Sequence, residues 1–227
     1  MTRTAVCCLW EGHDLPAYSA HQYDSHYVAN LARGLGPDVE LVCYVDGAPG
    51  PAFEDVADWR TFKYEHRGGW SRRLEPFAPE NRPRGSERHV LLDLDTIIVG
   101  NCDWLWEWDK ADVGCPLDPY FTGEICSTVI SYNEAGAELV WDAYLASDMM
   151  ELNFARGCYS EMVLLRTLQK QEKWPPLEEP KGQRLRSFKV DVPTKGWGDG
   201  CSLVFAHGNP KPHNLPDSHG LKAIWEG

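Results

Sequence analysis

The chain has 227 residues, of which 43% are hydrophobic and 25% are charged, and its net charge is −12. This composition is typical of a globular protein and excludes disordered and fibrous chains. No apolar run reaches the length of about 18 residues that a membrane-spanning helix needs. We therefore expect one globular domain over residues 1–227 and no membrane span. Glu11 comes too early in the chain for a typical signal peptide, which favours a cytoplasmic location.

Basic residues are concentrated in two segments, 60–89 and 166–195, which together contain 16 of the 22 lysines and arginines. Each segment has 8 basic and 4 acidic side chains, so each has a net charge of +4 within an acidic chain. Such local positive charge suits a polyanion, for example a diphosphate or a nucleic-acid backbone. The alternative is that these are solvated charges on loops.

The eight cysteines are scattered along the chain and form no Cys-x-x-Cys pair. This spacing indicates neither a zinc site nor a redox motif. Cys7, Cys43 and Cys126 lie within apolar runs, where a reduced thiol packs as a small hydrophobic side chain. We predict that all eight cysteines are free thiols.

Hydrophobic patterning predicts strands and helices that follow one another along the chain. The predicted strands cover residues 4–10, 40–46, 60–64, 89–99, 126–132 and 203–206. The predicted helices cover residues 19–35, a single turn at 71–77, residues 133–147 and residues 160–171. The apolar stripe of the third helix consists of Ala137, Val140, Trp141, Tyr144 and Leu145. The strand–helix–strand order and the nearly continuous apolar first strand indicate an α/β sandwich with a mixed, mostly parallel sheet.

Two aspartates come at the end of an apolar run, in residues 90–95 (VLLDLD). Because residues i and i+2 of a strand face the same side, Asp93 and Asp95 could share one cation. Carboxylate oxygens favour Mg²⁺ or Mn²⁺, which keep coordination positions open for phosphate oxygens. The alternative is a pair of solvated aspartates that cap a turn after the strand.

Residues 205–213 (FAHGNPKPH) add groups that suit the same chemistry. His207 directly follows a predicted buried strand and offers a nitrogen ligand. Gly208 permits close approach of the backbone to a ligand. Lys211, between two prolines, offers a positive charge for a phosphate. Together with the aspartates these residues favour a site for a metal ion and a diphosphate, whereas a histidine satisfied by a backbone hydrogen bond is the alternative.

These segments resemble the GT-A glycosyltransferases, in particular the small enzymes similar to glycosyltransferase family 8. Residues 91–101 (LLDLDTIIVGN) resemble the DxD strand of that group, and residues 207–213 resemble its HGxPKP ending. Residues 69–77 (GWSRRLEPF) resemble a further segment, with Arg73 where a donor-contacting lysine is usual. Residues 41–46 are a weaker match to the second strand of the group. The resemblance implies a single GT-A domain, which is a Rossmann-like sandwich.

The resemblance also implies roles for individual positions. It implies a metal ion, Mn²⁺ or else Mg²⁺, held by Asp93, Asp95 and His207. It implies a nucleoside-diphosphate sugar as the donor, and a UDP-sugar is the donor we expect. The donor-binding residues that it implies are Leu9, Trp10, Glu11, Asp46, Arg73, Asp93, Leu94, Gly208 and Lys211.

Ser127 and Glu161 are the predicted catalytic residues. The resemblance places Ser127 near the donor sugar. Relatives often have Gly-Asp-Gln where this chain has residues 159–161 (YSE), which leaves retention or inversion of the sugar open. Glu161 lies on the apolar stripe of its helix, where an unpaired carboxylate is costly, so we predict that it lines the site. The alternative is a charge that is only favoured by the helix dipole. The other residues of the stripe are Leu164, Leu165 and Leu168.

The expected function is the transfer of a sugar from a nucleotide sugar to an acceptor hydroxyl, and the acceptor is either a carbohydrate or a hydroxymethylated base in viral DNA. A duplex DNA acceptor would need its target base extruded, and Trp174 or Trp197 would suit stacking on that base. The basic residues that could line an acceptor groove together with Trp174 are Arg82, Arg84, Arg88, Lys181, Arg184, Arg186 and Lys189. One alternative function is a sugar-phosphate nucleotidyltransferase, although no Gly-rich phosphate loop follows the first predicted strand. The other is a non-catalytic domain that binds a nucleotide sugar.

Overall fold

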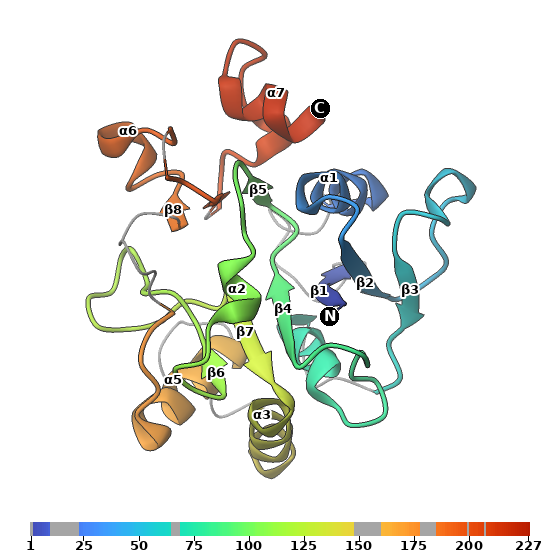
Figure 1. Cartoon of the computed structure of the whole chain (residues 1–227), viewed down its shortest axis with the longest axis vertical. Coiled ribbons are helices and arrows are strands. Elements are labelled where there is room, and N and C mark those ends of the chain that lie inside the picture. The colour runs from blue at the N-terminus through green and yellow to red at the C-terminus, as the bar shows by residue number, and fades with distance from the viewer. Residues whose placement is uncertain are drawn as a thin grey trace.

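The computed structural model describes residues 2–9, 23–64, 69–147, 160–177, 185–198, 200–206 and 208–227. Within these residues the chain forms a six-stranded central sheet and a smaller three-stranded sheet, and helices pack on both faces of the central one (Figure 1). The predicted α/β sandwich with a mixed, mostly parallel sheet is confirmed.

The central sheet has the strand order β3-β2-β1-β4-β7-β6. Its strands are β1 (Arg3–Leu9), β2 (Val39–Val45), β3 (Asp58–Thr61), β4 (Arg88–Leu92), β6 (Val113–Gly114) and β7 (Val129–Asn133). Strand β1 pairs in parallel with both β2 and β4, so that Val6 lies between Val42 and Leu91. Strand β7 is antiparallel to β4 and to β6. The strand order therefore reverses at β1, because the chain moves outward through β2 and β3 and then returns to the other side of β1 as β4.

The inner strands are apolar on both faces because both faces are covered. Ala5 and Cys7 of β1 pack in a core that includes residues of α1 (Ser25–Leu35). Val6 and Cys8 point the other way, into a core that includes residues of α3 (Glu134–Ala146) and α5 (Ser160–Glu172). This two-sided burial explains the nearly continuous apolar sequence of the first strand.

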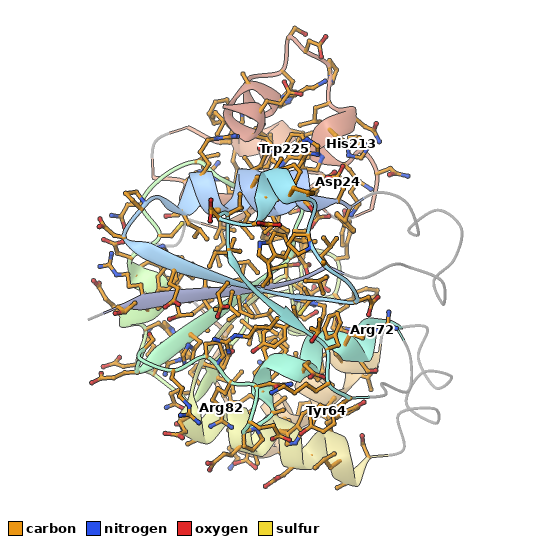
Figure 2. All side chains as sticks on the ribbon, turned by 90° about the vertical axis from the view of Figure 1, so that its right-hand side faces the viewer. Asp24, Tyr64, Arg72, Arg82, His213 and Trp225 are labelled. Atoms are coloured by element: carbon orange, nitrogen blue, oxygen red, sulfur yellow. The ribbon has the colours of Figure 1, made fainter. Side chains whose placement is uncertain are left out.

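The two layers of helices lie on opposite faces of the central sheet (Figure 2). Helices α1 and α7 (Gly220–Glu226) cover one face, while the 3₁₀ helix Gly69–Phe77 and helices α3 and α5 cover the other. Helix α1 begins at Ser25 and not at residue 19, because the Asp24 side chain caps it by accepting a hydrogen bond from the His26 backbone N–H at 3.0 Å. Residues 19–22 of the predicted helix lie outside the described residues.

The strand predicted over residues 89–99 is in fact two strands in different sheets. Strand β4 ends at Leu92, and β5 (Thr96–Ile98) belongs to the second sheet, whose order is β5-β9-β8. A hydrogen bond from the Thr96 N–H to the Asp93 carbonyl oxygen, at 3.2 Å, closes the turn between them. Apolar periodicity alone cannot reveal that a chain leaves one sheet for another. Asp93 and Asp95 therefore lie on a turn, and the prediction that they share one face of a strand was wrong.

The remaining differences concern short elements and single side chains. Strand β3 ends at Thr61, whereas the prediction placed a strand at 60–64. Leu145 is 56% exposed, so it does not belong to the buried stripe of α3 predicted for it. Strand β9 (Leu203–Phe205) was predicted. The elements that were not predicted are the 3₁₀ helices Pro51–Phe53 and Pro212–Asn214, α2 (Trp104–Glu107), β6, β8 (Leu185–Ser187), α6 (Val192–Lys195) and α7.

Two expectations from composition can be compared with the structure. Seven cysteines are described, and all seven are buried free thiols, as predicted. Cys158 lies outside the described residues. Over the described part of the chain, none of the helices combines the length and the apolar character needed to cross a bilayer.

Candidate functional site

Polar side chains converge at the edge of the central sheet where the strand order reverses. Open α/β sheets bind ligands beyond the carboxyl ends of their strands at such a point. Asp93 directly follows β4 at this edge, and Ser127 lies two residues before β7, which starts beside the end of β4. The Asp93 N–H donates to the Thr128 carbonyl oxygen at 2.9 Å and joins the two segments. The sheet topology thus brings Asp93 and Ser127 together.

Arg73 is the centre of this site. It is only 4% exposed and comes from the 3₁₀ helix Gly69–Phe77. Its Nη2 lies 2.9 Å from Asp93 Oδ1, and its Nη1 lies 3.0 Å from Glu161 Oε1. The guanidinium also donates to the Ser127 hydroxyl at 3.0 Å and to the Ser127 carbonyl oxygen at 2.6 Å. Four residues that the sequence singled out therefore form one network.

Glu161 enters the network from the first turn of α5. Its Oε1 accepts hydrogen bonds from Arg73 and, at 3.3 Å, from the Ser127 hydroxyl. Its Oε2 is buried and has no hydrogen-bond partner among the described residues. Such an oxygen is costly unless a partner reaches it, so a ligand hydroxyl that donates to Oε2 would be stabilised. The other residues of its stripe, Leu164, Leu165 and Leu168, are buried as predicted.

Burial and charge act against each other in the network. Burial raises the pKa of Glu161, Arg73 lowers it, and the net shift is upward. Burial also raises the pKa of Asp93 to about 7; Arg73 opposes this rise, whereas Asp95 and Glu161 add to it. Burial alone would lower the pKa of Arg73, but the neighbouring carboxylates outweigh burial and raise it. Arg73 therefore keeps a positive charge at this edge of the sheet.

Asp95 belongs to a neighbouring set of contacts. It is 3% exposed, and its Oδ2 accepts hydrogen bonds from Lys211 Nζ and, at 3.0 Å, from the Tyr23 hydroxyl. Burial and the Asp95 carboxylate raise the pKa of Tyr23, so its hydroxyl stays protonated and donates. Gly208 leads into this segment with a φ of 63°, a left-handed conformation that favours glycine. The structure therefore brings Asp95 and Lys211 together as an ion pair.

The two aspartates can be tested for their fit to a divalent cation. Within the described residues each carboxylate uses one oxygen for its ion pair, while Asp93 Oδ2 and Asp95 Oδ1 make no hydrogen bond. Carboxylate oxygens are the ligands that Mg²⁺ and Mn²⁺ prefer, so the two aspartates fit such an ion. The described residues contain no cluster of three potential metal ligands, and His207, the third ligand predicted, lies outside them.

The structure describes three more of the predicted donor-binding residues, and their surroundings differ from one to the next. Leu9 ends β1 at the same edge and is half-buried. Asp46 follows β2, and its Oδ2 lies 3.1 Å from Arg72 Nη1. The Leu94 side chain is 5% exposed and packs in the core, so only the backbone of this residue is left to contact a donor. Trp10 and Glu11 lie outside the described residues.

Several residues of the two basic segments make internal contacts. Trp174 is 8% exposed and packs in the core, so it cannot stack on an extruded base. The guanidinium of Arg88 donates to the Ser131 hydroxyl, and that of Arg186 donates to the carbonyl oxygens of residues 195 and 196. These charges serve internal contacts. Arg82 is also largely buried, Trp197 is half-buried, Arg84 and Lys189 are exposed, and Lys181 and Arg184 lie outside the described residues.

Sequence reasoning missed Tyr23 entirely. It carries no motif, and its contact with Asp95 spans 72 residues, so no local spacing points to it. The sequence also suggested a ligand role for Arg73 without the carboxylate partners that surround it. Arg73 is paired with the buried Glu161 in the structure. Its burial could have been predicted only if this partner had been known.

No protein-family profile matches the sequence, and a search of curated proteins finds no match. Solved structures do resemble the fold. The apo form of the glycosyltransferase GlyE from Streptococcus pneumoniae TIGR4 aligns with a TM-score of 0.62 at 13% identity, over 99% of this chain and 59% of GlyE. This chain therefore spans less than two thirds of the length of GlyE.

The galactosyltransferase LgtC, in complex with donor and acceptor sugar analogues, aligns with a TM-score of 0.63 at 12% identity. That alignment covers 98% of this chain and 94% of LgtC. An active-site mutant of LgtC aligns with a TM-score of 0.57 at 11% identity. At such identities the likeness establishes the fold, so this chain has the GT-A glycosyltransferase fold.

Proposed function

We propose that this protein is a glycosyltransferase that moves a sugar from a nucleoside-diphosphate sugar, a UDP-sugar by expectation, to an acceptor hydroxyl. The observation that carries the proposal is the buried network of Arg73, Ser127 and Glu161 beside Asp93. It lies at the edge of a GT-A sheet where ligands bind, and it holds a carboxylate oxygen that has no partner among the described residues.

The positive side chains of the site suit the leaving diphosphate. Breaking the bond between sugar and diphosphate develops negative charge on the phosphate oxygens. Arg73 is held in place by two carboxylates, so its charge is pre-oriented at this edge. Lys211 rests on Asp95 and would turn to the phosphate oxygens when a donor binds. Charges that need no reorganisation stabilise a transition state most effectively.

Ser127 and Glu161 suit the sugar. The Ser127 hydroxyl and Glu161 Oε1 already hydrogen-bond each other and Arg73, which fixes the orientation of the carboxylate. Oε2 is then left to accept a hydrogen bond from a sugar hydroxyl. These two residues would therefore orient the donor sugar while the glycosidic bond breaks.

Asp93 and Asp95 would hold a divalent cation, Mn²⁺ or Mg²⁺, through the oxygens that their ion pairs leave open. When bound, such an ion supplies positive charge that neutralises the diphosphate. The fit of the two carboxylates supports this role. His207 would complete the ligand set in the proposal.

The test is hydrolysis of a panel of nucleotide sugars in the presence of MnCl₂, with the release of nucleoside diphosphate and free sugar measured by chromatography. We expect one donor to be cleaved and excess EDTA to stop its cleavage. Release of pyrophosphate from a nucleoside triphosphate and a sugar phosphate would instead indicate a nucleotidyltransferase. Donor binding without any turnover would indicate a non-catalytic domain.

The Glu161→Gln variant should lower donor cleavage about 100-fold, because the neutral side chain holds a sugar hydroxyl and Arg73 less strongly. The shape of the side chain is kept, so thermal unfolding serves as the control. If Glu161 only interacted with the helix dipole, the free energy of unfolding of the variant would fall by less than about 1 kcal/mol. The variant would then cleave the donor at the wild-type rate.

We take the acceptor to be a carbohydrate, since two aromatic side chains are exposed on the loop that leads into Ser127. Tyr120 is 52% exposed and Phe121 is 57% exposed. The loop is anchored by a buried ion pair between Arg166 and Asp118 at 2.8 Å, and the Arg166 guanidinium lies 5.6 Å from the Phe121 ring centroid. Exposed aromatic rings on a loop that leads into Ser127 would suit stacking on a sugar ring.

The Tyr120→Ala variant should raise the KM for an oligosaccharide acceptor about three- to tenfold, because it removes one stacking ring. Donor hydrolysis without acceptor should not change. Leu145→Ala is the matched control, since Leu145 is similarly exposed but lies on α3. Transfer to hydroxymethylated DNA, with none to any carbohydrate, would contradict this choice of acceptor.

A further inference from the structure

One aromatic residue contacts both members of the Asp95–Lys211 ion pair. The Tyr23 hydroxyl donates to Asp95 Oδ2 at 3.0 Å, the same oxygen that accepts from Lys211. The Lys211 ammonium lies 5.1 Å from the centroid of the Tyr23 ring, within the range of a cation–π contact. Tyr23 therefore binds the carboxylate with its hydroxyl and the ammonium with its ring.

Tyr23 is itself held by groups that return to the segment of Lys211. The Tyr27 and Tyr23 rings pack edge to face, with centroids 5.0 Å apart and an interplanar angle of 84°. The Tyr27 hydroxyl hydrogen-bonds His213 Nδ1. His213 lies two residues after Lys211, in the 3₁₀ helix Pro212–Asn214, and Figure 2 shows it beside the start of α1. The contacts therefore form a closed ring that ties the start of α1 to residues 211–214.

We propose that Tyr23 is a positioning residue, which keeps Asp95 oriented toward a cation while Lys211 turns from Asp95 to a diphosphate. The proposal rests on the proposed function, because it assigns Asp95 and Lys211 to one donor site. Sequence motifs mark only the two charged residues, whereas Tyr23 provides the contact that both share.

Asp95 needs this second contact because Lys211 has two competing partners. In the structure it satisfies the buried Asp95 carboxylate, but in transfer it would have to meet the phosphate oxygens. When Lys211 moves, Asp95 keeps a charge-assisted hydrogen bond from Tyr23, so its carboxylate is neither unsatisfied nor free to rotate. The ring face of Tyr23 meanwhile stabilises the ammonium after it has turned to the phosphate.

The two contacts of Tyr23 can be separated by two variants of the full chain. Tyr23→Phe removes only the hydroxyl, and it should weaken the binding of Mn²⁺ alone about tenfold, as loss of a group that orients a metal ligand does. It should leave the binding of inorganic pyrophosphate unchanged. Tyr23→Leu also removes the ring, and it should in addition weaken pyrophosphate binding about threefold.

Mn²⁺ binding is measured by electron paramagnetic resonance of the free ion, and pyrophosphate binding by calorimetry. Tyr44→Phe is the control, since it removes a buried hydroxyl that donates to the Asn81 carbonyl oxygen on the other face of the sheet. It should lower thermal stability as much as Tyr23→Phe does but leave Mn²⁺ binding unchanged. Equal Mn²⁺ affinity in the wild type and Tyr23→Phe overturns the inference and leaves the proposed function standing. A wild type that neither binds Mn²⁺ nor cleaves a donor overturns both.

Discussion

Replacing Arg73 by methionine is expected to lower the free energy of unfolding by about 3–5 kcal/mol, the usual effect of removing one partner of a buried ion pair. Arg73 is 4% exposed, and Glu161, which it neutralises, is 1% exposed. Without the guanidinium, the Glu161 carboxylate remains buried with a weak hydroxyl donor and must protonate or admit water. Asp93, whose side chain is 28% exposed, is solvated more easily and adds less to the loss.

Urea unfolding of Arg73→Met, Glu161→Leu, their combination and one control variant tests this explanation. Arg73→Met combined with Glu161→Leu should recover much of the stability, because no uncompensated charge remains buried. If the losses of unfolding free energy of the two single variants simply add in the double variant, Arg73 and Glu161 do not stabilise each other. Arg88→Met is the matched control, since Arg88 is also buried but lies at the opposite end of β4 and donates to neutral oxygens. It should lose stability and keep donor cleavage, whereas Arg73→Met should lose both.

The Asp93→Asn and Asp95→Asn variants should each lower donor cleavage by at least about 100-fold, because each removes a carboxylate that would hold the divalent cation beside the diphosphate. Their effects on stability should differ in sign at pH 8. Asp95 is buried against Lys211, so Asp95→Asn leaves a buried ammonium without its partner and destabilises the protein. The raised pKa of Asp93 shows that its charged form is costly, and Arg73 keeps Glu161 as a partner, so Asp93→Asn should stabilise the protein.

The pH dependence of the Asp93 variant follows from the raised pKa of this group. Its pKa is about 7 in the folded protein and lower in the unfolded chain, so the folded state binds the proton more tightly. The wild type therefore loses stability as the pH rises toward 7, and this loss is absent from Asp93→Asn. Chemical unfolding at pH 8 and pH 4 should show that the advantage of the variant shrinks toward pH 4. An advantage that is equal at both values would contradict the assignment.

The sequence alone determined the elements that are buried on two faces or along a clear stripe. Strand β1 and helices α3 and α5 lie within one residue of their predicted bounds at each end. Periodicity is reliable for such segments because burial acts on every second residue of a strand, or on every third or fourth residue of a helix. The short elements β8 and α6 escaped prediction, since three or four residues contain no full period.

The sequence also singled out Arg73, Asp93, Ser127, Glu161 and Lys211 one by one, from motif and spacing. Which of them meet was decided by the tertiary structure alone. Arg73 reaches Glu161 across 88 residues, and Lys211 reaches Asp95 across 116. These pairs exist because the reversal of strand order at β1 collects the ends of several strands at one edge. A buried carboxylate needs a cation as a partner, and the fold can supply it from any part of the chain. The local sequence around the carboxylate therefore does not show which residue that partner is.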